Sequence, residues 1–382
     1  MMEIWAICLI LGGGVYLIFV SKIISGLIRL QSETAINSDY TPRVSIVIAA
    51  RNEEKDIGNT LQHVLAQDYS EEMYEVIVVD DRSEDDTSKI VKTLSETDPR
   101  VQHIRQTEIE EHLSPKKQAL ERGIQTAIGE IIITTDADCI PAKGWIRALV
   151  SRFKPDTGMV LGQARFEIGE SPPLWQRLQS LDFRSQGYAA AGLAVSGMPF
   201  SCTGASLAFR KQAYEDVNGY DGVTKLISGD DELLLAKICQ SKWKVNVSRE
   251  TDVVVPTRPP LSLHELWFQR IRWGSKALFI QTSRKLFLMG VFLFLLSLSI
   301  GPIVSILFSS WWLLIGMFTL KCVLDLLSVA IGKTVYREKV NWIDFFLLEL
   351  IHAPALVLLT TAGHIFSFEW KGQTFHSQGS AK

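Results

Sequence analysis

The stretch Ile131-Ile132-Ile133-Thr134-Thr135-Asp136-Ala137-Asp138 is an apolar β-type run that breaks at once into two carboxylates. Such a run predicts a buried strand that delivers both acids to the edge of a sheet. Oxygen ligands suit hard divalent cations such as Mg²⁺ and Mn²⁺, which leave room for substrate phosphates. We therefore expect Asp138 to bind a metal that neutralises a nucleotide diphosphate, and Asp136 to bind the same metal or a ribose.

The apolar residues are concentrated at the two ends of the chain. The protein has 382 residues, of which 47% are hydrophobic and 21% are charged. A helix needs about 20 apolar residues to cross a ~30 Å hydrocarbon core. Four segments are candidates for such helices: Ile4–Val20 with an extension to Ile28, Leu286–Phe308, Trp311–Ile331 and Ile343–Phe366. The sequence thus predicts an integral membrane protein with one N-terminal span and about three C-terminal spans, although Pro354 leaves a re-entrant last segment open.

Basic residues near the spans indicate the side on which the middle of the chain lies. The first span has no basic segment before it and no clear cleavage site after it, which favours a retained anchor over a removed signal peptide. Lys22, Arg29 and Arg43 follow the apolar stretch, whereas Glu3 precedes it. By the positive-inside rule, the domain after this anchor lies in the cytoplasm, in a bacterium at the inner membrane. The side of the C-terminus stays open.

Residues 44–135 alternate between strand-like and helical patterns, which predicts an α/β fold with a mostly parallel sheet. The expected strands are Val44–Ala50, Tyr74–Val79, Val101–Ile104 and Glu130–Thr135, and the expected helices are Glu53–Gln67, Asp85–Ser95 and Lys116–Ile128. Further along, we expect helices at 143–153, 172–183 and 231–240, strands at 203–209 and 244–255, and a basic amphipathic helix at 263–279.

These patterns divide the chain into an anchor at 1–30, a linker at 31–42, a catalytic α/β domain at 43–257, an interface helix at 258–285, membrane segments at 286–370 and a tail at 371–382. Five cysteines without CxxC spacing indicate free thiols in a reducing compartment. The net charge of −3 excludes a general nucleic-acid binder.

Polar clusters follow three of the predicted strands. Arg51-Asn52-Glu53 follows the first strand, Asp80 and Asp81 the second, and the Asp136 pair the fourth. Ligands bind beyond the carboxyl ends of the strands in such sheets, so we expect these clusters to share one cleft. Asp80 and Asp81 suit a base N–H or ribose hydroxyls, whereas residues 83–86 suit turn and capping roles.

A later acidic cluster, Ser228-Gly229-Asp230-Asp231-Glu232, precedes an apolar run. Acids at a helix start favour the positive end of its dipole, which is one sufficient explanation. Displacement of a sugar phosphate, however, needs a base that takes the proton of the acceptor hydroxyl. We expect Asp230 to be that base, with Asp231 as the alternative.

The segment Gln269-Arg270-Ile271-Arg272-Trp273 lies in the predicted interface helix. Positions i, i+3 and i+4 share a helix face, so Gln269, Arg272 and Trp273 point the same way and Arg270 points elsewhere. An arginine grips phosphate oxygens and an indole stacks on a sugar ring, which suits a diphosphate leaving group beside a sugar. A basic helix on anionic lipid is the other interpretation, and both can hold.

The chain resembles a membrane-anchored family 2 glycosyltransferase with the GT-A fold. The resemblance covers residues 44 to 273 and is carried by seven segments in family order: VSIVIAARNEE, VIVVDDRSEDDT, SPKKQALERGI, TTDADC, TGASLAFRKQAYEDVNGYDG, SGDD and QRIRW. Two segments differ from the family pattern: Ser-Gly-Asp replaces the commoner Thr-Glu-Asp before the base, and Ala49-Ala50-Arg51 replaces a proline-and-tyrosine version.

The resemblance implies a role for each matching residue. Asp80 or Asp81 would contact the base or ribose, and Lys116 would reach the nucleotide or diphosphate. Asp138 would bind Mg²⁺ or Mn²⁺, and Asp230 would be the base. The residues that would bind the nucleotide sugar are Glu53, Asp80, Asp81, Lys116, Asp136, Gln269, Arg272 and Trp273, with Asp136 and Asp138 on the metal.

We therefore expect an inverting, metal-dependent transfer of a sugar from a nucleotide sugar, UDP-linked by preference, to a hydroxyl at the cytoplasmic membrane face. Ceramide glucosyltransferase-like enzymes add one sugar to a lipid, whereas processive synthases extrude a polymer. Four membrane segments are few for a polymer channel, which favours a lipid or lipid-linked acceptor over a polysaccharide. A membrane subunit that binds nucleotide without catalysis is the third alternative.

Overall fold

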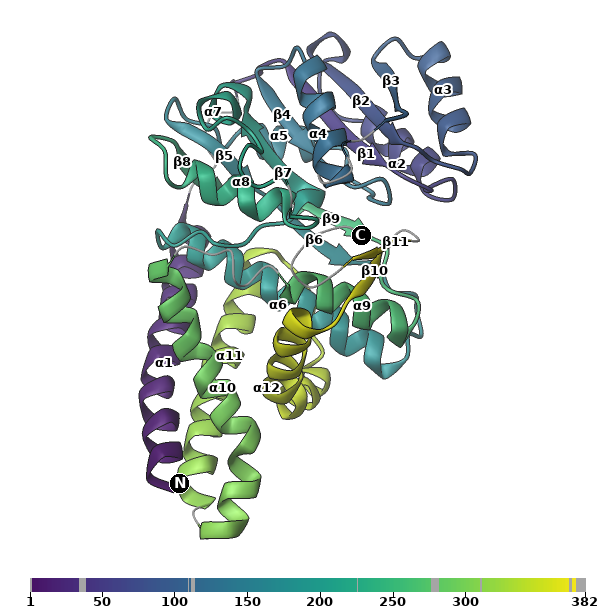
Figure 1. Ribbon diagram of the computed structural model, residues 1–382. Coiled ribbons are helices and arrows are strands. Elements are labelled where there is room, and N and C mark those ends of the chain that lie inside the picture. Colours follow the sequence, from purple (N-terminus) through teal and green to yellow (C-terminus); the bar gives the residue numbers. More distant parts are fainter. Residues whose placement is uncertain are drawn as a thin grey trace.

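The computed structural model describes residues 2–33, 39–108, 110, 114–224, 226–275, 282–309, 311–370 and 373–375. A sheet domain lies at one end of the molecule and long helices at the other (Figure 1). Most of the predicted tail and residues 34–38 of the predicted linker lie outside the described residues.

The first half of the domain is a parallel sheet that begins with the predicted strands. The order β3-β2-β1-β4 joins Val101–Gln106, Tyr74–Asp81, Val44–Ala50 and Ile131–Thr134. Every pair among these four strands is parallel. The helices that connect them are α2 (Ile57–Leu65), α3 (Thr87–Thr97) and α4 (Pro115–Thr126). Because all four strands run the same way, their carboxyl ends meet at one edge of the sheet.

The second half extends the sheet with strands that the sequence patterns only partly predicted. The sheet continues as β7 (Leu207–Arg210), β5 (Thr157–Leu161) and β8 (Lys244–Val247), and β7 is antiparallel to both neighbours. A separate two-stranded sheet pairs β6 (Gln163–Phe166) with β9 (Val254–Thr257). The single strand expected at 244–255 is wrong, because a turn of 3-10 helix at Thr251–Val253 separates β8 from β9. Short helices complete this half: α5 (Trp145–Val150), α7 (Lys211–Asp216) and α8 (Asp230–Ile238).

Among the described residues, four helices are long and apolar enough to cross a membrane, one at the N-terminal side and three at the C-terminal side. They are α1 (Met2–Ser32), α10 (Thr282–Phe308), α11 (Trp311–Val335) and α12 (Trp342–Ile365). This confirms the predicted fold class, an α/β domain with a mostly parallel sheet beside one N-terminal and three C-terminal helices. A hairpin of β10 (Phe368–Trp370) and β11 (Gln373–Phe375) follows α12.

Two further helices lie between the sheet domain and the membrane helices (Figure 1). They are α6 (Leu174–Val195) and α9 (Leu263–Gly274). The helix α6 is longer than the predicted 172–183, because the small residues after Phe183 continue it along α1. A Cβ on Gly192 would lie 2.4 Å from the carbonyl oxygen of Ile23 in α1. Small side chains are therefore what allows α6 to cross the anchor closely.

The anchor helix also shares the core of the sheet domain. Ile23, Leu27 and Leu30 at the end of α1 belong to the same buried cluster as the strands. Arg152, almost fully buried, bridges this end of the anchor to the domain through ion pairs with Glu33 (3.3 Å) and Glu250 (3.1 Å). The sheet domain therefore packs rigidly on the end of the first membrane helix.

Candidate functional site

One cavity of about 1560 Å³ extends from the carboxyl edge of the sheet to the membrane helix α12. It is lined by all the predicted site residues except Asp80: Glu53, Asp81, Lys116, Asp136, Asp138, Asp230, Asp231, Gln269, Arg272 and Trp273. Residues that are up to 220 positions apart in the sequence thus meet around one space.

The Lys116 ammonium connects the two acidic clusters. It donates to Asp136 at 2.8 Å and lies 3.4 Å from an Asp230 oxygen. Burial by itself would lower the pKa of Lys116, but Asp136 and Asp230 outweigh it and raise that pKa above its ordinary value. Lys116 is therefore a permanent cation between the acid pair that ends β4 and the acid pair that begins α8.

Asp138 lies deeper than Asp136 and accepts a hydrogen bond from the Thr257 hydroxyl at 3.3 Å. Burial, with help from the charges of Asp136 and Glu53, raises the pKa of Asp138 to about 6. A neighbouring carboxylate adds to the effect of burial on this pKa, and a divalent cation bound between the two acids would lower the pKa again.

A metal ion fits at this position. Ligand atoms of Asp136, Asp138 and Cys139 all lie within 4.8 Å of one another. The Cys139 thiol is fully buried, and its pKa is raised well above the ordinary value by burial and by the two neighbouring carboxylates. A neutral thiol is a poor ligand, so the two carboxylates are the donors that match Mg²⁺ or Mn²⁺.

The neighbours Asp230 and Asp231 have different surroundings. Asp231 accepts hydrogen bonds from the backbone N–H of Gly204 (2.9 Å) and of Glu232 (2.8 Å). Asp230 instead faces Lys116 in the cavity. Backbone hydrogen bonds fix Asp231 in the lining of the cavity, so Asp230 is the carboxylate that can contact a substrate.

Gly229 sets the position of Asp230. It has φ of +81°, a left-handed conformation that favours glycine, and Asp230 is the first residue of α8 directly after it. Glycine in place of the more common glutamate thus gives the backbone a sharp turn into the helix. Just before it, the backbone carbonyl of Ser228 accepts a hydrogen bond from the fully buried Lys117 at 3.1 Å.

At the far end of the cavity, Asp80 and Asp81 point in different directions. Asp81 lines the cavity and forms an ion pair with Arg82 at 2.8 Å. Asp80 is completely buried and accepts from the backbone N–H of Ser83 at 3.1 Å, which fixes the loop after β2. Between these two acids, the geometry favours Asp81 for contact with a nucleotide.

The loops after β1 and β2 hold each other in place. The N–H of Glu53 donates to the Thr87 hydroxyl at 2.7 Å, and the N–H of Asn52 donates to the Ser83 hydroxyl at 3.0 Å. Ser83 therefore has a structural role, and Asp85 accepts from the N–H of Thr87 while it also lines the cavity. Glu53 lines the cavity close enough to Asp138 to influence its charge.

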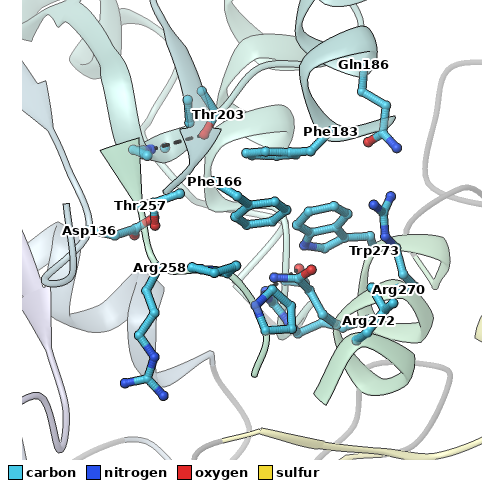
Figure 2. Close-up of a pocket in the computed structure, with 18 of the residues that line it drawn as sticks. Asp136, Phe166, Phe183, Gln186, Thr203, Thr257, Arg258, Arg270, Arg272 and Trp273 are labelled. Atoms are coloured by element: carbon cyan, nitrogen blue, oxygen red, sulfur yellow. Dashed lines mark hydrogen bonds between the residues drawn. The ribbon is translucent and has the colours of Figure 1, made fainter. Parts of the chain in front are cut away.

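The helix α9 contributes an aromatic and a cationic part to the cavity wall. The Arg272 guanidinium is half-buried and donates to the Ser228 hydroxyl at 3.4 Å, beside the Asp230 cluster. The Trp273 ring stacks on Phe183 with centroids 5.6 Å apart, and Phe183 stacks on Phe166 at 4.2 Å. Figure 2 shows these three rings together in the cavity, with Asp136 on one side and Arg270 on the other.

Arg270 and Asp182 line the cavity as well, although the helical spacing placed Arg270 on another face. Arg270 pairs with Asp182 of α6 at 2.7 Å and lies over the Trp273 ring at 4.9 Å. Sequence reasoning missed Asp182, Phe183 and Phe166 as site residues. The predicted helix at 172–183 contained two of them, but no pattern in the sequence indicated that this helix packs against α9.

The comparisons with known proteins agree with this geometry. Residues 45–217 match the family described as Glycosyl transferase family 2. These residues form a family 2 glycosyl transferase domain. With 21% sequence identity and a TM-score of 0.61, the fold matches a mannosyltransferase from Pyrobaculum calidifontis, solved in complex with GDP-Man and Mn²⁺, over 95% of this chain and 97% of that one. The predicted GT-A fold is therefore confirmed.

Two curated relatives have different products. A beta-monoglucosyldiacylglycerol synthase from Synechocystis sp. is 27% identical over 234 residues, which are 61% of this chain and 47% of that protein. A poly-beta-1,6-N-acetyl-D-glucosamine synthase from Staphylococcus aureus is 26% identical over 271 residues, 69% of this chain and 60% of that protein. The chain thus spans about half the length of these relatives, and one makes a glycolipid while the other makes a polysaccharide.

Proposed function

We propose that this protein is an inverting, metal-dependent glycosyltransferase that moves a sugar from a nucleotide sugar, UDP-linked by preference, to a lipid or lipid-linked hydroxyl at the cytoplasmic face of a membrane. The observation that carries the proposal is the position of Lys116. It joins Asp136 on the predicted metal side to Asp230 on the predicted base side, within one cavity that continues to a membrane helix.

The residues of the cavity divide the reaction between them. The Asp230 carboxylate takes the proton of the acceptor hydroxyl as its oxygen attacks the anomeric carbon. Lys116 and Arg272 supply fixed positive charge beside the departing diphosphate. A divalent cation held by Asp136 and Asp138 would neutralise the same leaving group. Attack from the side opposite to the diphosphate inverts the anomeric centre.

At the two ends of the site, Asp81 and Glu53 would hold the nucleoside, while Trp273 would stack on a sugar ring. Contacts with Phe183 and Arg270 fix the orientation of the Trp273 ring in the cavity wall. The basic residues that follow the first span support a cytoplasmic location of the site.

The experiment is a screen of nucleotide sugars for metal-dependent release of nucleoside diphosphate by the purified full chain. We expect release with one donor, dependent on Mg²⁺ or Mn²⁺ and lost in Asp138→Ala and Asp230→Ala variants that remain folded. Normal turnover in both variants would remove this mechanism. A nucleotide-binding subunit without catalysis would show no donor turnover at all, even as slow hydrolysis.

A processive polysaccharide synthase is the second candidate, because one relative makes poly-β-1,6-N-acetyl-D-glucosamine and the QRIRW segment resembles such enzymes. Product length separates the two functions. With radiolabelled donor, a single product indicates one transfer to a lipid, whereas a ladder of products indicates a synthase.

A further inference from the structure

The cavity does not end at the aromatic stack but continues between α6, α9 and α12. We name the lining that these three helices contribute the acceptor chamber. From α12 it includes Leu348, Ile351, His352, Ala355, Leu356, Leu358, Leu359 and Thr360. Ile351 and Leu358 are 47% and 58% exposed on this apolar helix. Because α12 is long and apolar enough to cross a membrane, hydrocarbon chains can reach the chamber from the side.

The charges in the acceptor chamber are balanced among themselves. Among the described residues of α6, α9 and α12 that line it, the two arginines already face acids: Arg270 pairs with Asp182, and Arg272 lies beside Ser228 and is attracted by Asp230. A phosphate in the chamber would share it with the carboxylate of Asp182, and both arginines of this lining already face acids. Burial of such an extra charge is costly unless it is paired.

Two buried polar atoms in the chamber have no hydrogen-bond partner among the described residues. The Gln179 side chain is only 5% exposed, and its Oε1 has no hydrogen-bond partner within the part of the chain that the structure describes. The same holds for Nδ1 of His352 on α12. Both residues line the cavity. Buried polar atoms without a partner are rare in native proteins, and both of these atoms suit hydroxyl groups.

We propose that the acceptor chamber binds a lipid with an uncharged headgroup that carries hydroxyls, such as a glycerolipid, rather than a lipid phosphate. This inference rests on the proposed function and specifies its acceptor class. The acyl chains lie along α12, and a headgroup hydroxyl points past Trp273 to Asp230. In the reaction, the bond from that oxygen to the anomeric carbon forms, the bond to the diphosphate breaks, and the hydroxyl proton passes to the Asp230 carboxylate.

The test compares two acceptors with the full chain in lipid–detergent micelles and the donor found in the nucleotide-sugar screen. The acceptors are dioleoylglycerol and a long-chain polyprenyl phosphate. We expect kcat/KM for the neutral lipid to exceed that for the phosphate by about tenfold or more, as expected for a site whose charges oppose one substrate. Preference for the polyprenyl phosphate would overturn the proposal. So would transfer to neither lipid by a protein that still hydrolyses the donor.

The variant Asp182→Asn gives a second, independent reading. This variant leaves Arg270 without its acid. The ratio of kcat/KM for the neutral acceptor to kcat/KM for the phosphate acceptor should therefore fall several-fold, even if both rates drop because Trp273 moves. The matched control is Asp344→Asn, which breaks the 2.6 Å ion pair of Arg177 between α12 and α6 outside the cavity. That control should keep the wild-type ratio. An unchanged ratio in Asp182→Asn would contradict the charge argument.

Failure of the acceptor inference and failure of the proposed function give different results. If only the acceptor inference is wrong, metal-dependent binding and hydrolysis of the nucleotide sugar are still observed. If neither binding nor hydrolysis is observed, the proposed function is wrong as well. Calorimetric titration of the full chain with UDP and Mn²⁺ measures the binding directly and needs no acceptor.

Discussion

Asp230 and Asp231 are adjacent in the chain but have different tasks, because one faces the cavity and the other is bonded to the backbone. Asp231 accepts from two N–H groups, while Asp230 faces Lys116. We expect Asp230→Asn to reduce kcat by about 10²–10⁴-fold with a normal melting temperature, since a general base contributes that much. Asp231→Asn should instead lower the melting temperature. Equal loss of kcat in two stable variants would contradict this division.

Asp138 makes metal binding depend on pH. Its pKa of about 6 means that the carboxyl carries a proton below that pH, and the proton must leave before a cation binds. Mn²⁺ affinity should therefore rise by about tenfold per pH unit up to pH ~6 and then level off. Calorimetric titrations between acidic and neutral pH measure this directly.

The variant Glu53→Gln tests the physical cause of that pH dependence. The charge of Glu53 raises the pKa of Asp138, although less than burial and the charge of Asp136 do. Its removal should move the midpoint of the Mn²⁺ affinity curve to lower pH. A midpoint that stays in place would show that Glu53 does not influence the site.

At the residue scale, the sequence motifs predicted which residues line the cavity. The DxD pair, Lys116 and the polar and aromatic residues of the QRIRW segment line the cavity, because the carboxyl ends of parallel strands and the start of a following helix converge in this fold. The roles of individual acids were not predictable. Both acids lie in β2, where successive side chains point to opposite faces, and the sequence pattern did not show which of the two faces the cavity.

At the scale of elements, close helix crossings position the site. A Cβ on Gly26 of α1 would lie 1.8 Å from the carbonyl oxygen of Gly192 in α6, and a Cβ on Gly363 of α12 would lie 2.8 Å from Gly274 in α9. The helices α6 and α9, which line the acceptor chamber, therefore pack against the membrane helices α1 and α12 through glycine contacts. The sequence showed small residues at 187–197 but not their partners.

The contact between α1 and α6 predicts a steric effect. Gly26→Val should destabilise the protein by at least about 1–3 kcal/mol, because the backbone of α6 would have to move away. Gly14→Val is the matched control on the same helix, since no atom lies within 4 Å of a Cβ at that position. Thermal unfolding in detergent compares them. Equal melting temperatures would show that the two helices do not cross closely.

At the scale of the whole molecule, the anchor and the catalytic domain are less separate than the composition of the chain suggests. The patterns predicted an anchor at 1–30, a linker and then a domain, yet α1 continues to Ser32 and its last turns join the core of the sheet. The C-terminal half joins the same core through Tyr336, whose hydroxyl accepts from Gln163 at 3.2 Å. The length and hydropathy of an apolar stretch identify a membrane span, but they do not show which of its residues pack against a distant domain.

This shared core leads to a prediction about the anchor. Leu27 is completely buried against the sheet domain, whereas its neighbour Ile28 is 52% exposed. Leu27→Ala should therefore reduce the stability of the catalytic domain by about 2–5 kcal/mol, as truncations in a packed core do. Ile28→Ala removes a similar side chain from the same helix turn and should have little effect. Thermal unfolding followed through nucleotide binding reports on the domain itself. If both variants unfold at the wild-type temperature, α1 tethers the domain to the membrane but does not contribute to the stability of its core.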